Sequence, residues 1–449
     1  MFAVGNFGSR MITFFMVPLY THYLTTSDYG KTDLITTVVG LLTPLLTLSA
    51  TESVFRFAMV KSKSKGEVLT NGMLISFGGL VAILMVSPFL FSFPLVEYIL
   101  VLSFLSAIEL MFQEFARGIG ESKIFAITGI LMTIITVSSN IVLIVFNGWK
   151  LNGFLVSLVL AQLGGILFLV IRLKLGQYLR IKFVNHLTVK RMLSYSVPLI
   201  PNQISWWISN SASKLFIAFF LGTAANGLFA VANKIPSLIS VFTNVFSQAW
   251  QISAVDEFKK EGSGEFFSRV LALLTIVVCV GVIGLSGLSR LFVLMLSNRA
   301  YLGAAKAVPW LALAVAFSTI SSFLGTVYAA TMKTGFLFVT TLSGAIVNVI
   351  ANAVLIPMVG LNGAGIGAYL SFLVVTILRY IDAQKFIRIK IDWLYLCVVQ
   401  VIVFIEYFGL FVSKTDLYIF VEACGMIVGL GFSGVKGFYL AKTLHLRGL

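Results

Sequence analysis

The sequence is poor in charge. Only 11% of its 449 residues are Asp, Glu, Lys or Arg, less than half of the roughly 25% typical of a soluble domain. By contrast, 59% of the residues are hydrophobic and the mean hydropathy is +1.00. Disorder is excluded too, because a disordered chain has few apolar residues and much charge. The composition therefore predicts a polytopic membrane protein.

Cysteine and histidine are equally scarce. Cys279, Cys397 and Cys424 lie in separate apolar runs without a CxxC spacing, so we expect buried, inert side chains. The three histidines are too dispersed to bind a metal or to form a catalytic triad, and no Walker A motif is present. We therefore expect no cofactor, no metal and no enzymatic activity.

The first apolar run begins at Phe2, with almost no leader before it. It lacks the basic segment and the small-residue cleavage site of a removable signal peptide. We therefore expect this run to stay in the protein as its first helix, and translation to start further upstream.

Apolar runs separated by polar residues, glycine or proline predict fourteen transmembrane helices of about 20 residues each. Their approximate ranges are 2–24, 33–58, 68–91, 94–117, 124–147, 152–173, 192–221, 225–250, 267–289, 303–331, 336–357, 362–381, 393–413 and 417–440. Because fourteen is even, both termini are expected on the same side of the membrane.

Basic residues identify that side. Most of the 32 Lys and Arg residues lie in the loops after even-numbered helices or in the C-terminal tail. Positive loops stay in the cytoplasm, so we expect both termini there. This distribution explains the net charge of +15 by membrane insertion and contact with anionic lipids, and we expect no nucleic-acid partner.

Two short motifs recur along the chain. Residues 140–144 read NIVLI and 352–356 read NAVLI, and each is followed by LNG, at 151–153 and 361–363. The offsets of 212 and 210 residues pair predicted helices 1–6 with helices 7–12. Because six is even, the two halves have the same orientation, as in the parallel repeats of transporters.

The repeat divides the expected all-α fold into three parts. Residues 1–190 form an N-terminal lobe of six helices, and residues 191–390 form a C-terminal lobe of six. Residues 391–449 hold two extra helices outside the repeat. A two-lobed membrane protein of this kind is more typical of a transporter than of a receptor.

Four cations lie within predicted spans: Arg10 in helix 1, Lys214 in helix 7, Lys234 in helix 8 and, at the rim, Lys306 in helix 10. A charge inside a bilayer costs about 3 kcal/mol on insertion scales and is a default functional candidate. A central cleft that gathers these cations would bind an anionic substrate such as a pyrophosphate. Alternatively, each cation extends to the interface or pairs with a nearby acid.

Acidic residues within the spans are candidates for ion coupling. Glu109 lies deep in its helix without a basic residue one turn away, and Glu52 is a second candidate. Glu52 and Arg56 are also spaced to form an ion pair on one helix face. Glu406 and Glu422 are single acids in the two extra helices, where each can be an interfacial or inter-helix contact.

Predicted helix 7 is interrupted by Pro198 and Pro201. Proline removes a backbone donor and bends a helix, and free carbonyls at membrane depth are tolerated where they line a cavity. Helix 7 is thus expected to be a flexible cavity wall, or else a kinked helix whose neighbours satisfy it. The candidate lining residues are Asn202, Gln203, Trp206 and Asn210. The indole of Trp206 can stack on a sugar or simply fill space.

Three segments resemble a known family. Residues 7–30, 194–239 and 352–371 are similar to the corresponding parts of bacterial polysaccharide transporters. These are the O-antigen and capsule repeat-unit flippases of the multidrug/oligosaccharidyl-lipid/polysaccharide (MOP) exporter superfamily, which have a MATE-like fold. Members often carry an acid beside the basic residue of helix 7, whereas this chain has Ser213 before Lys214. Ion coupling here would therefore use another carboxylate or none.

The resemblance implies a function. Such a protein moves an undecaprenyl-pyrophosphate-linked oligosaccharide across the bacterial inner membrane by alternating access, driven in some members by an ion gradient. The two extra helices would form a groove for the lipid tail, and a glycan polymerase and other assembly proteins are candidate partners. The alternatives are a lipid II flippase, a multidrug exporter and a non-transporting scaffold in a glycan assembly complex.

Overall fold

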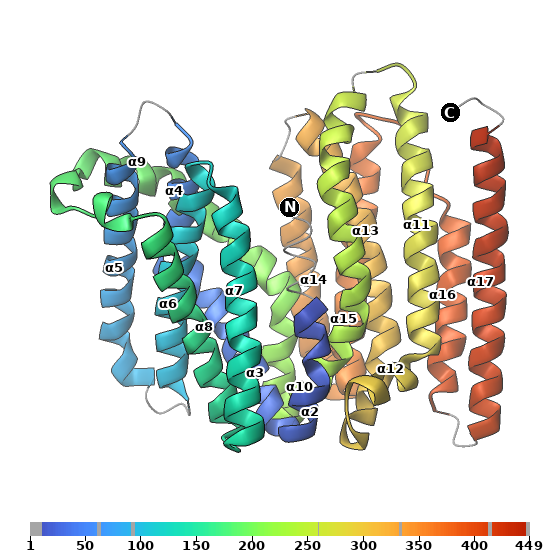
Figure 1. Cartoon of the computed structure of the whole chain (residues 1–449). Coiled ribbons are helices and arrows are strands. Elements are labelled where there is room, and N and C mark those ends of the chain that lie inside the picture. Colours follow the sequence, from blue (N-terminus) through green and yellow to red (C-terminus); the bar gives the residue numbers. More distant parts are fainter. Residues whose placement is uncertain are drawn as a thin grey trace. The chain divides into compact units, whose positions relative to one another are not determined.

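The computed structural model describes residues 11–60, 64–90, 95–258, 260–331, 335–411 and 415–445, except for individual side chains within these ranges. Throughout these residues the regular secondary structure is helical (Figure 1), which confirms the all-α prediction. Many large apolar side chains remain exposed, among them Phe219 at 83% and Phe146 at 77%. Such surfaces suit a bilayer, where the surrounding solvent is itself apolar.

Eight helices of the described chain are long and apolar enough to cross a membrane, or nine if one bent pair counts as a span. The predicted number of fourteen is not confirmed. One of the eight, Asn210–Gln251, has 42 residues, about 63 Å of helix and twice the thickness of a bilayer core. Gly222 interrupts it with φ 84° and ψ 173°, at the predicted junction of helices 7 and 8.

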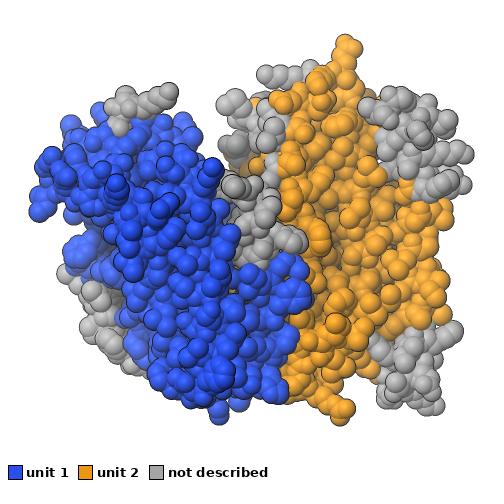
Figure 2. Space-filling model, in the orientation of Figure 1, with its two compact units in different colours: residues 1–207 blue, residues 208–449 orange. Residues whose placement is uncertain are grey.

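The chain forms two compact units, residues 1–207 and 208–449, which Figure 2 colours separately. The division falls within α10 (Ile200–Glu257). The predicted division at residues 190 and 390 describes repeats and not packing, and it stays a prediction.

Unit 1 packs its helices around a core of large apolar side chains such as Leu69, Met111, Phe115, Leu169 and Met192. Its elements before α10 are α2 (Val17–Tyr23), α3 (Thr26–Leu46), α4 (Ala50–Ala58), α5 (Lys65–Leu90), α6 (Val96–Gly118), α7 (Ser122–Asn140), the π-helical turn η1 (Ile141–Phe146), α8 (Lys150–Arg172), the short turns η2 (Leu175–Gln177) and η3 (Ile181–Phe183), α9 (His186–Ser196) and η4 (Val197–Leu199).

Unit 2 contains most of α10, followed by α11 (Ser263–Gly287), α12 (Ser289–Leu296), η5 (Arg299–Ala307), α13 (Val308–Thr331), α14 (Gly335–Val359), α15 (Leu361–Ala383), α16 (Trp393–Gly409) and α17 (Thr415–His445). Arg379 of α15 is only 4% exposed. Its guanidinium donates to the Ser321 carbonyl of α13 and to the hydroxyls of Thr340 and Thr341 of α14. One buried cation thus ties three helices together.

Buried asparagines support the repeat. Asn140 is fully buried, donates to the Tyr20 hydroxyl of α2 at 2.9 Å and accepts from the Ser157 hydroxyl of α8 at 2.7 Å. Its counterpart Asn352 is also fully buried and donates to the Ser213 hydroxyl of α10 at 2.9 Å. Each asparagine therefore bonds to the first helix of its own half.

The glycines of the two LNG motifs make equivalent contacts. A methyl group on Gly363 would overlap the backbone of Leu355, and one on Gly153 would lie 3.2 Å from the backbone carbon of Leu143. The two contacted residues are equivalent in the NIVLI and NAVLI motifs. In both halves, the LNG glycine thus lets the helix that follows the motif pack closely against it.

The two halves differ in how the side-chain oxygen of the repeated asparagine is bonded. Gly367 occupies the position that corresponds to Ser157, and the Oδ1 atom of Asn352 has no hydrogen-bond partner among the described residues. A methyl group on Gly367 would lie 3.1 Å from that oxygen. The first half therefore satisfies the oxygen of its buried asparagine, whereas in the second half the Asn352 amide donates both to Ser213 and to Asn348 and the oxygen accepts no bond from a described residue.

We expect Ser157→Ala to lower the unfolding free energy by about 1–3 kcal/mol, because it leaves the buried Oδ1 atom of Asn140 without a donor. The measurement is the thermal unfolding midpoint in detergent. Ser343→Ala is the control, because the Ser343 hydroxyl is exposed and bonds to the Val339 carbonyl of its own helix. Equal midpoints for the two variants would contradict the assignment.

Candidate functional site

Helices α3 and α4 form one bent element. They meet at 60°, with Leu48 (φ 47°) and Ser49 (φ 53°) in the left-handed region. Pro44 has no amide hydrogen, and its carbonyl accepts from the Ser49 amide across the bend. The sequence predicted a single continuous helix over residues 33–58. That prediction is wrong at this bend, because neither left-handed residue is a glycine that would have marked it.

Gly79 of α5 supports the bend from outside. A methyl group at this position would overlap the carbonyl oxygen of Leu46, the last residue of α3. The backbones of α3 and α5 thus touch where α3 ends, and the position of α4 depends on that contact.

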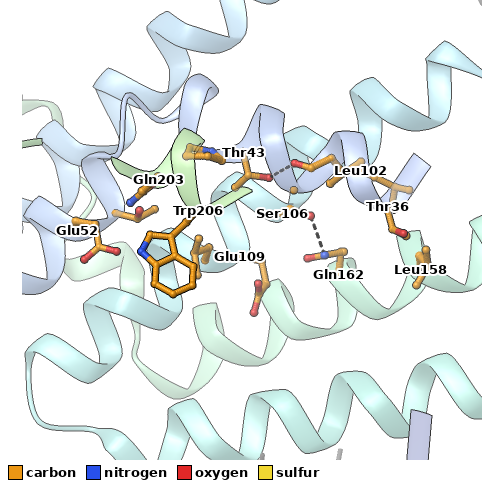
Figure 3. A pocket seen from close by; sticks show the side chains of 15 residues that line it. Thr36, Thr43, Glu52, Leu102, Ser106, Glu109, Leu158, Gln162, Gln203 and Trp206 are labelled. Carbon is orange, nitrogen blue, oxygen red and sulfur yellow. Dashed lines mark hydrogen bonds between the residues drawn. The ribbon is translucent and has the colours of Figure 1, made fainter. Parts of the chain in front are cut away.

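A cavity of about 670 Å³ lies on the inner side of the bend, within unit 1. This volume lies in the usual range for small-molecule sites, about 300–1,000 Å³. Five segments line it: α3, α4, α6, α8 and the first turns of α10 (Figure 3). The lining residues are Thr36, Val39, Gly40, Thr43, Pro44, Thr51, Glu52, Leu102, Ser106, Glu109, Leu110, Leu158, Gln162, Gln203 and Trp206.

Four of the predicted site residues border this cavity: Glu52, Glu109, Gln203 and Trp206. Both candidates for ion coupling therefore lie beside two of the candidate lining residues, as Figure 3 shows. Glu109 is 7% exposed. Its Oε1 atom has no hydrogen-bond partner among the described residues, while Gln113 bonds to the same carboxyl group. Glu52 is exposed, and among the described residues it forms no ion pair with Arg56.

Hydrogen bonds fix the polar wall of the cavity. The Gln162 amide donates to the Ser106 hydroxyl at 2.9 Å, which joins α8 to α6. The Ser49 hydroxyl, at the bend, donates to Oε1 of Gln203 at 3.2 Å. Hydroxyls, amides, an indole and two carboxyls thus surround a space large enough for a polar organic ligand.

The prolines of predicted helix 7 break it. Pro198 lies in the turn η4 between α9 and α10. Pro201 is the second residue of α10. A backbone amide at this position has no partner within the helix, so the proline removes no helical hydrogen bond. Pro198 is exposed in η4, Pro201 and Asn202 are exposed at the start of α10, and Asn210 is exposed further along it. None of these four lines the cavity.

The predicted cationic residues lie elsewhere. Arg10 falls outside the described residues. Lys214 and Lys234 are half-buried on the unit 2 part of α10, and the Lys306 ammonium lies 4.3 Å from the centre of the Phe411 ring. No lysine or arginine lines the described cavity of unit 1. The cleft that gathers all four cations stays a prediction.

Ser213, which precedes Lys214 in predicted helix 7, makes a contact between two helices. Its hydroxyl accepts from Asn352 and so holds α10 against α14. A contact between helices therefore occupies the position where family members often carry a carboxylate.

Two acids that the sequence treated separately come together in unit 2. Glu406 of α16 and Glu422 of α17 are 0% and 5% exposed, and their carboxyl groups interact. Gly425 and Gly287 leave room for the Glu406 side chain. The sequence indicated only that each of the two extra helices carries one acid. It did not indicate that the two acids are close, because it does not show how the helices are rotated.

The expectation for the cysteines is wrong for two of the three. Cys279 is buried, but Cys397 and Cys424 are exposed. A thiol is a small, weakly polar group, so an apolar run accepts it equally on the lipid-facing side of a helix.

A second cavity, of about 500 Å³, is almost entirely apolar. It lies between residues 238–246 of α10 and 270–285 of α11. The lipid-tail groove was expected at α16 and α17, and that groove stays a prediction.

Comparisons with known proteins agree with this architecture. A family model described as "Polysaccharide biosynthesis protein" matches residues 1–251, whereas no curated protein sequence matches significantly. A structure of the lipid II flippase MurJ, in an inward closed conformation, is similar over 99% of both chains, with a TM-score of 0.69 and 12% identity.

Two transporters of the MATE type are also similar. An inward-facing MATE transporter of the MOP superfamily gives a TM-score of 0.65 at 14% identity, over 86% of this chain and 94% of its own. A mutant of a Vibrio cholerae MATE transporter gives 0.58 at 11% identity, over 84% and 93%. At these identities the likeness shows the fold, and the predicted MATE-like architecture is confirmed.

Proposed function

Because the chain belongs to the polysaccharide biosynthesis protein family, we propose that it moves an undecaprenyl-pyrophosphate-linked oligosaccharide across the bacterial inner membrane by alternating access. The oligosaccharide is a repeat unit of O-antigen, capsule or another surface polysaccharide. The protein is a multi-pass membrane transporter and not an enzyme, and the loop charges favour cytoplasmic termini. Its partners are the lipid-linked substrate and membrane lipids, joined by a glycan polymerase and other assembly proteins.

The cavity of unit 1 supports a carbohydrate substrate. Sugars present hydroxyls along their edges and C–H groups on their faces. The amides of Gln162 and Gln203 can bond to hydroxyls in both senses, and the half-exposed indole of Trp206 can cover an apolar face. This set of side chains around about 670 Å³ is the single observation that carries the proposal.

The charged groups bind the pyrophosphate and couple transport to an ion gradient. Arg10, Lys214, Lys234 and Lys306 bind the pyrophosphate, because unpaired phosphates cannot enter the bilayer core unaided. Glu109, with Glu52 near it, couples the cycle to an ion gradient. The lipid tail stays in the bilayer beside α16 and α17, while rocking of the two six-helix lobes moves the headgroup.

Alanine at Arg10 or Lys214 is expected to abolish transport while the protein still inserts. The measurement is restoration of surface polysaccharide in a strain that lacks the gene, together with the amount of protein in the membrane. Lys123→Ala, which removes an exposed cation at the start of α7, is the control. Transport at the wild-type level by both alanine variants would refute a role for these cations.

A lipid II flippase is the second candidate, favoured by the MurJ likeness over 99% of both chains. The two cargoes share the polyprenyl pyrophosphate but differ in their sugars and in the peptide of lipid II. Proteoliposomes that contain one fluorescent cargo at a time separate them. Faster transport of lipid II would replace the proposal, and export of organic cations alone would favour a multidrug exporter.

A further inference from the structure

A short extended segment follows α15 in unit 2. It reads Ile387-Arg388-Ile389-Lys390, and the period of two places alternate side chains on opposite faces. Ile387 and Ile389 are 7% and 1% exposed, whereas Arg388 and Lys390 are exposed. The alternation therefore presents two cations on one face.

Contacts with α11 and with the end of α15 hold this segment in place. The Lys390 amide donates to the Ser268 hydroxyl at 2.9 Å, and the Gln384 side chain donates to the Ile389 carbonyl at 2.6 Å. Gly264 leaves room for the segment, since a methyl group there would lie 2.7 Å from the Arg388 carbonyl oxygen. The two cations thus stand on a fixed backbone.

The segment forms one wall of a cavity of about 900 Å³, separate from the cavity of unit 1. Four cations line this basic pocket: Arg269, Arg388, Lys390 and Lys436. Two acids also line it, and each is already paired, Glu265 with Arg269 at 2.5 Å and Asp392 with Lys436.

Two positive charges therefore remain in the basic pocket. Neither Arg388 nor Lys390 forms an ion pair with a described residue. Their charges have no acidic partner in the pocket, which is therefore complementary to an anion.

The position of the basic pocket points to a lipid. It lies at the first turns of α11, a candidate span, where α16 also begins with Trp393. The first turn of α11 and the C-terminal end of α17 lie together at the upper edge of Figure 1. Tryptophan and basic residues at helix ends are typical of the headgroup layer.

We propose that the basic pocket binds the phosphate of an anionic phospholipid headgroup and thereby links α16 and α17 to α11. Basic pockets between transmembrane helices bind such headgroups. This site is independent of the transported cargo, because none of its residues belongs to the unit 1 cavity or to the predicted cationic cleft.

The test uses the full-length protein in vesicles of phosphatidylcholine, with and without phosphatidylglycerol. Bound phosphatidylglycerol is counted by native mass spectrometry, and the thermal midpoint is measured in parallel. For R388S/K390S we expect phosphatidylglycerol to bind about 25-fold more weakly, since each cation near an anionic headgroup contributes about fivefold. The exchange R388K/K390R keeps both charges and should keep the binding.

K174S/K190S is the matched control, because it removes two exposed cations from unit 1. We expect it to bind phosphatidylglycerol like the wild type. Equal loss in the control would show a general charge effect and overturn the site, and so would unchanged binding by R388S/K390S. A third arm adds inorganic phosphate to pure phosphatidylcholine vesicles. Equal stabilisation there would show a free-phosphate site and overturn the assignment to a lipid.

Discussion

Alanine at Gly79 is expected to abolish transport and to lower the unfolding free energy by about 3 kcal/mol or more. The added methyl group would overlap the carbonyl oxygen of Leu46, which belongs to the backbone and cannot rotate away as a side chain could. Either α5 moves outward or the end of α3 shifts. A shift of α3 would displace α4, and with it Glu52 and one wall of the cavity.

Gly78→Ala is a closely matched control for this change. Its methyl group would meet no atom within 4 Å, and it adds the same group one residue earlier in the same helix. We expect it to transport at the wild-type level with an unchanged or slightly higher thermal midpoint, since alanine favours a helix over glycine. Wild-type transport and stability in Gly79→Ala would disprove the support that α5 gives to the bend.

Glutamine at Glu109 is expected to reduce gradient-driven transport to the rate measured without a gradient. The substitution keeps the size and shape of the side chain but removes the carboxyl group that could bind a coupling ion. Glu109 is the buried carboxyl at the described cavity, and a buried acid in a span is costly unless it has a function. Cargo binding should remain, because the amides and Trp206 are unchanged.

Proteoliposomes with an imposed proton or sodium gradient measure this effect. Downhill exchange of labelled cargo in the same vesicles shows whether the variant is still folded and binding. Glu52→Gln, at the exposed carboxyl of the same cavity, is the comparison, and we expect a smaller loss. Full gradient dependence in Glu109→Gln would remove Glu109 from the coupling mechanism.

The sequence located most helices closely because a span is a long apolar run. The predicted ranges 336–357 and 362–381 correspond to α14 (Gly335–Val359) and α15 (Leu361–Ala383). The repeat was also readable, since its motifs contain a buried asparagine and a closely packed glycine. The bend at Leu48 and Ser49 was not, because apolar and small residues continue through it without a glycine.

The candidate site was predictable only in part. Glu109 could be selected because a deep acid is rare in a membrane helix, whereas its neighbours Gln162 and Gln203 come from distant segments. Which face of each helix lines a cavity depends on rotation, and apolar runs do not encode rotation. That Glu406 and Glu422 lie close enough to interact was missed for the same reason.

The unequal environments of Asn140 and Asn352 have a mechanical consequence. The two repeats use different hydrogen bonds at equivalent helix contacts. The Asn140 oxygen accepts from Ser157 of α8, whereas Gly367 of α15 has no side chain that could donate to Asn352. Where α14 meets α15, Ser371 donates to the Gly344 carbonyl and Arg379 donates to the hydroxyls of Thr340 and Thr341. Among the described residues, sliding would therefore break three hydrogen bonds between these helices, and one where α7 meets α8. The contact between α7 and α8 is thus the one with fewer polar restraints, and loss of the Ser157 hydroxyl alone would remove the hydrogen bond that joins them.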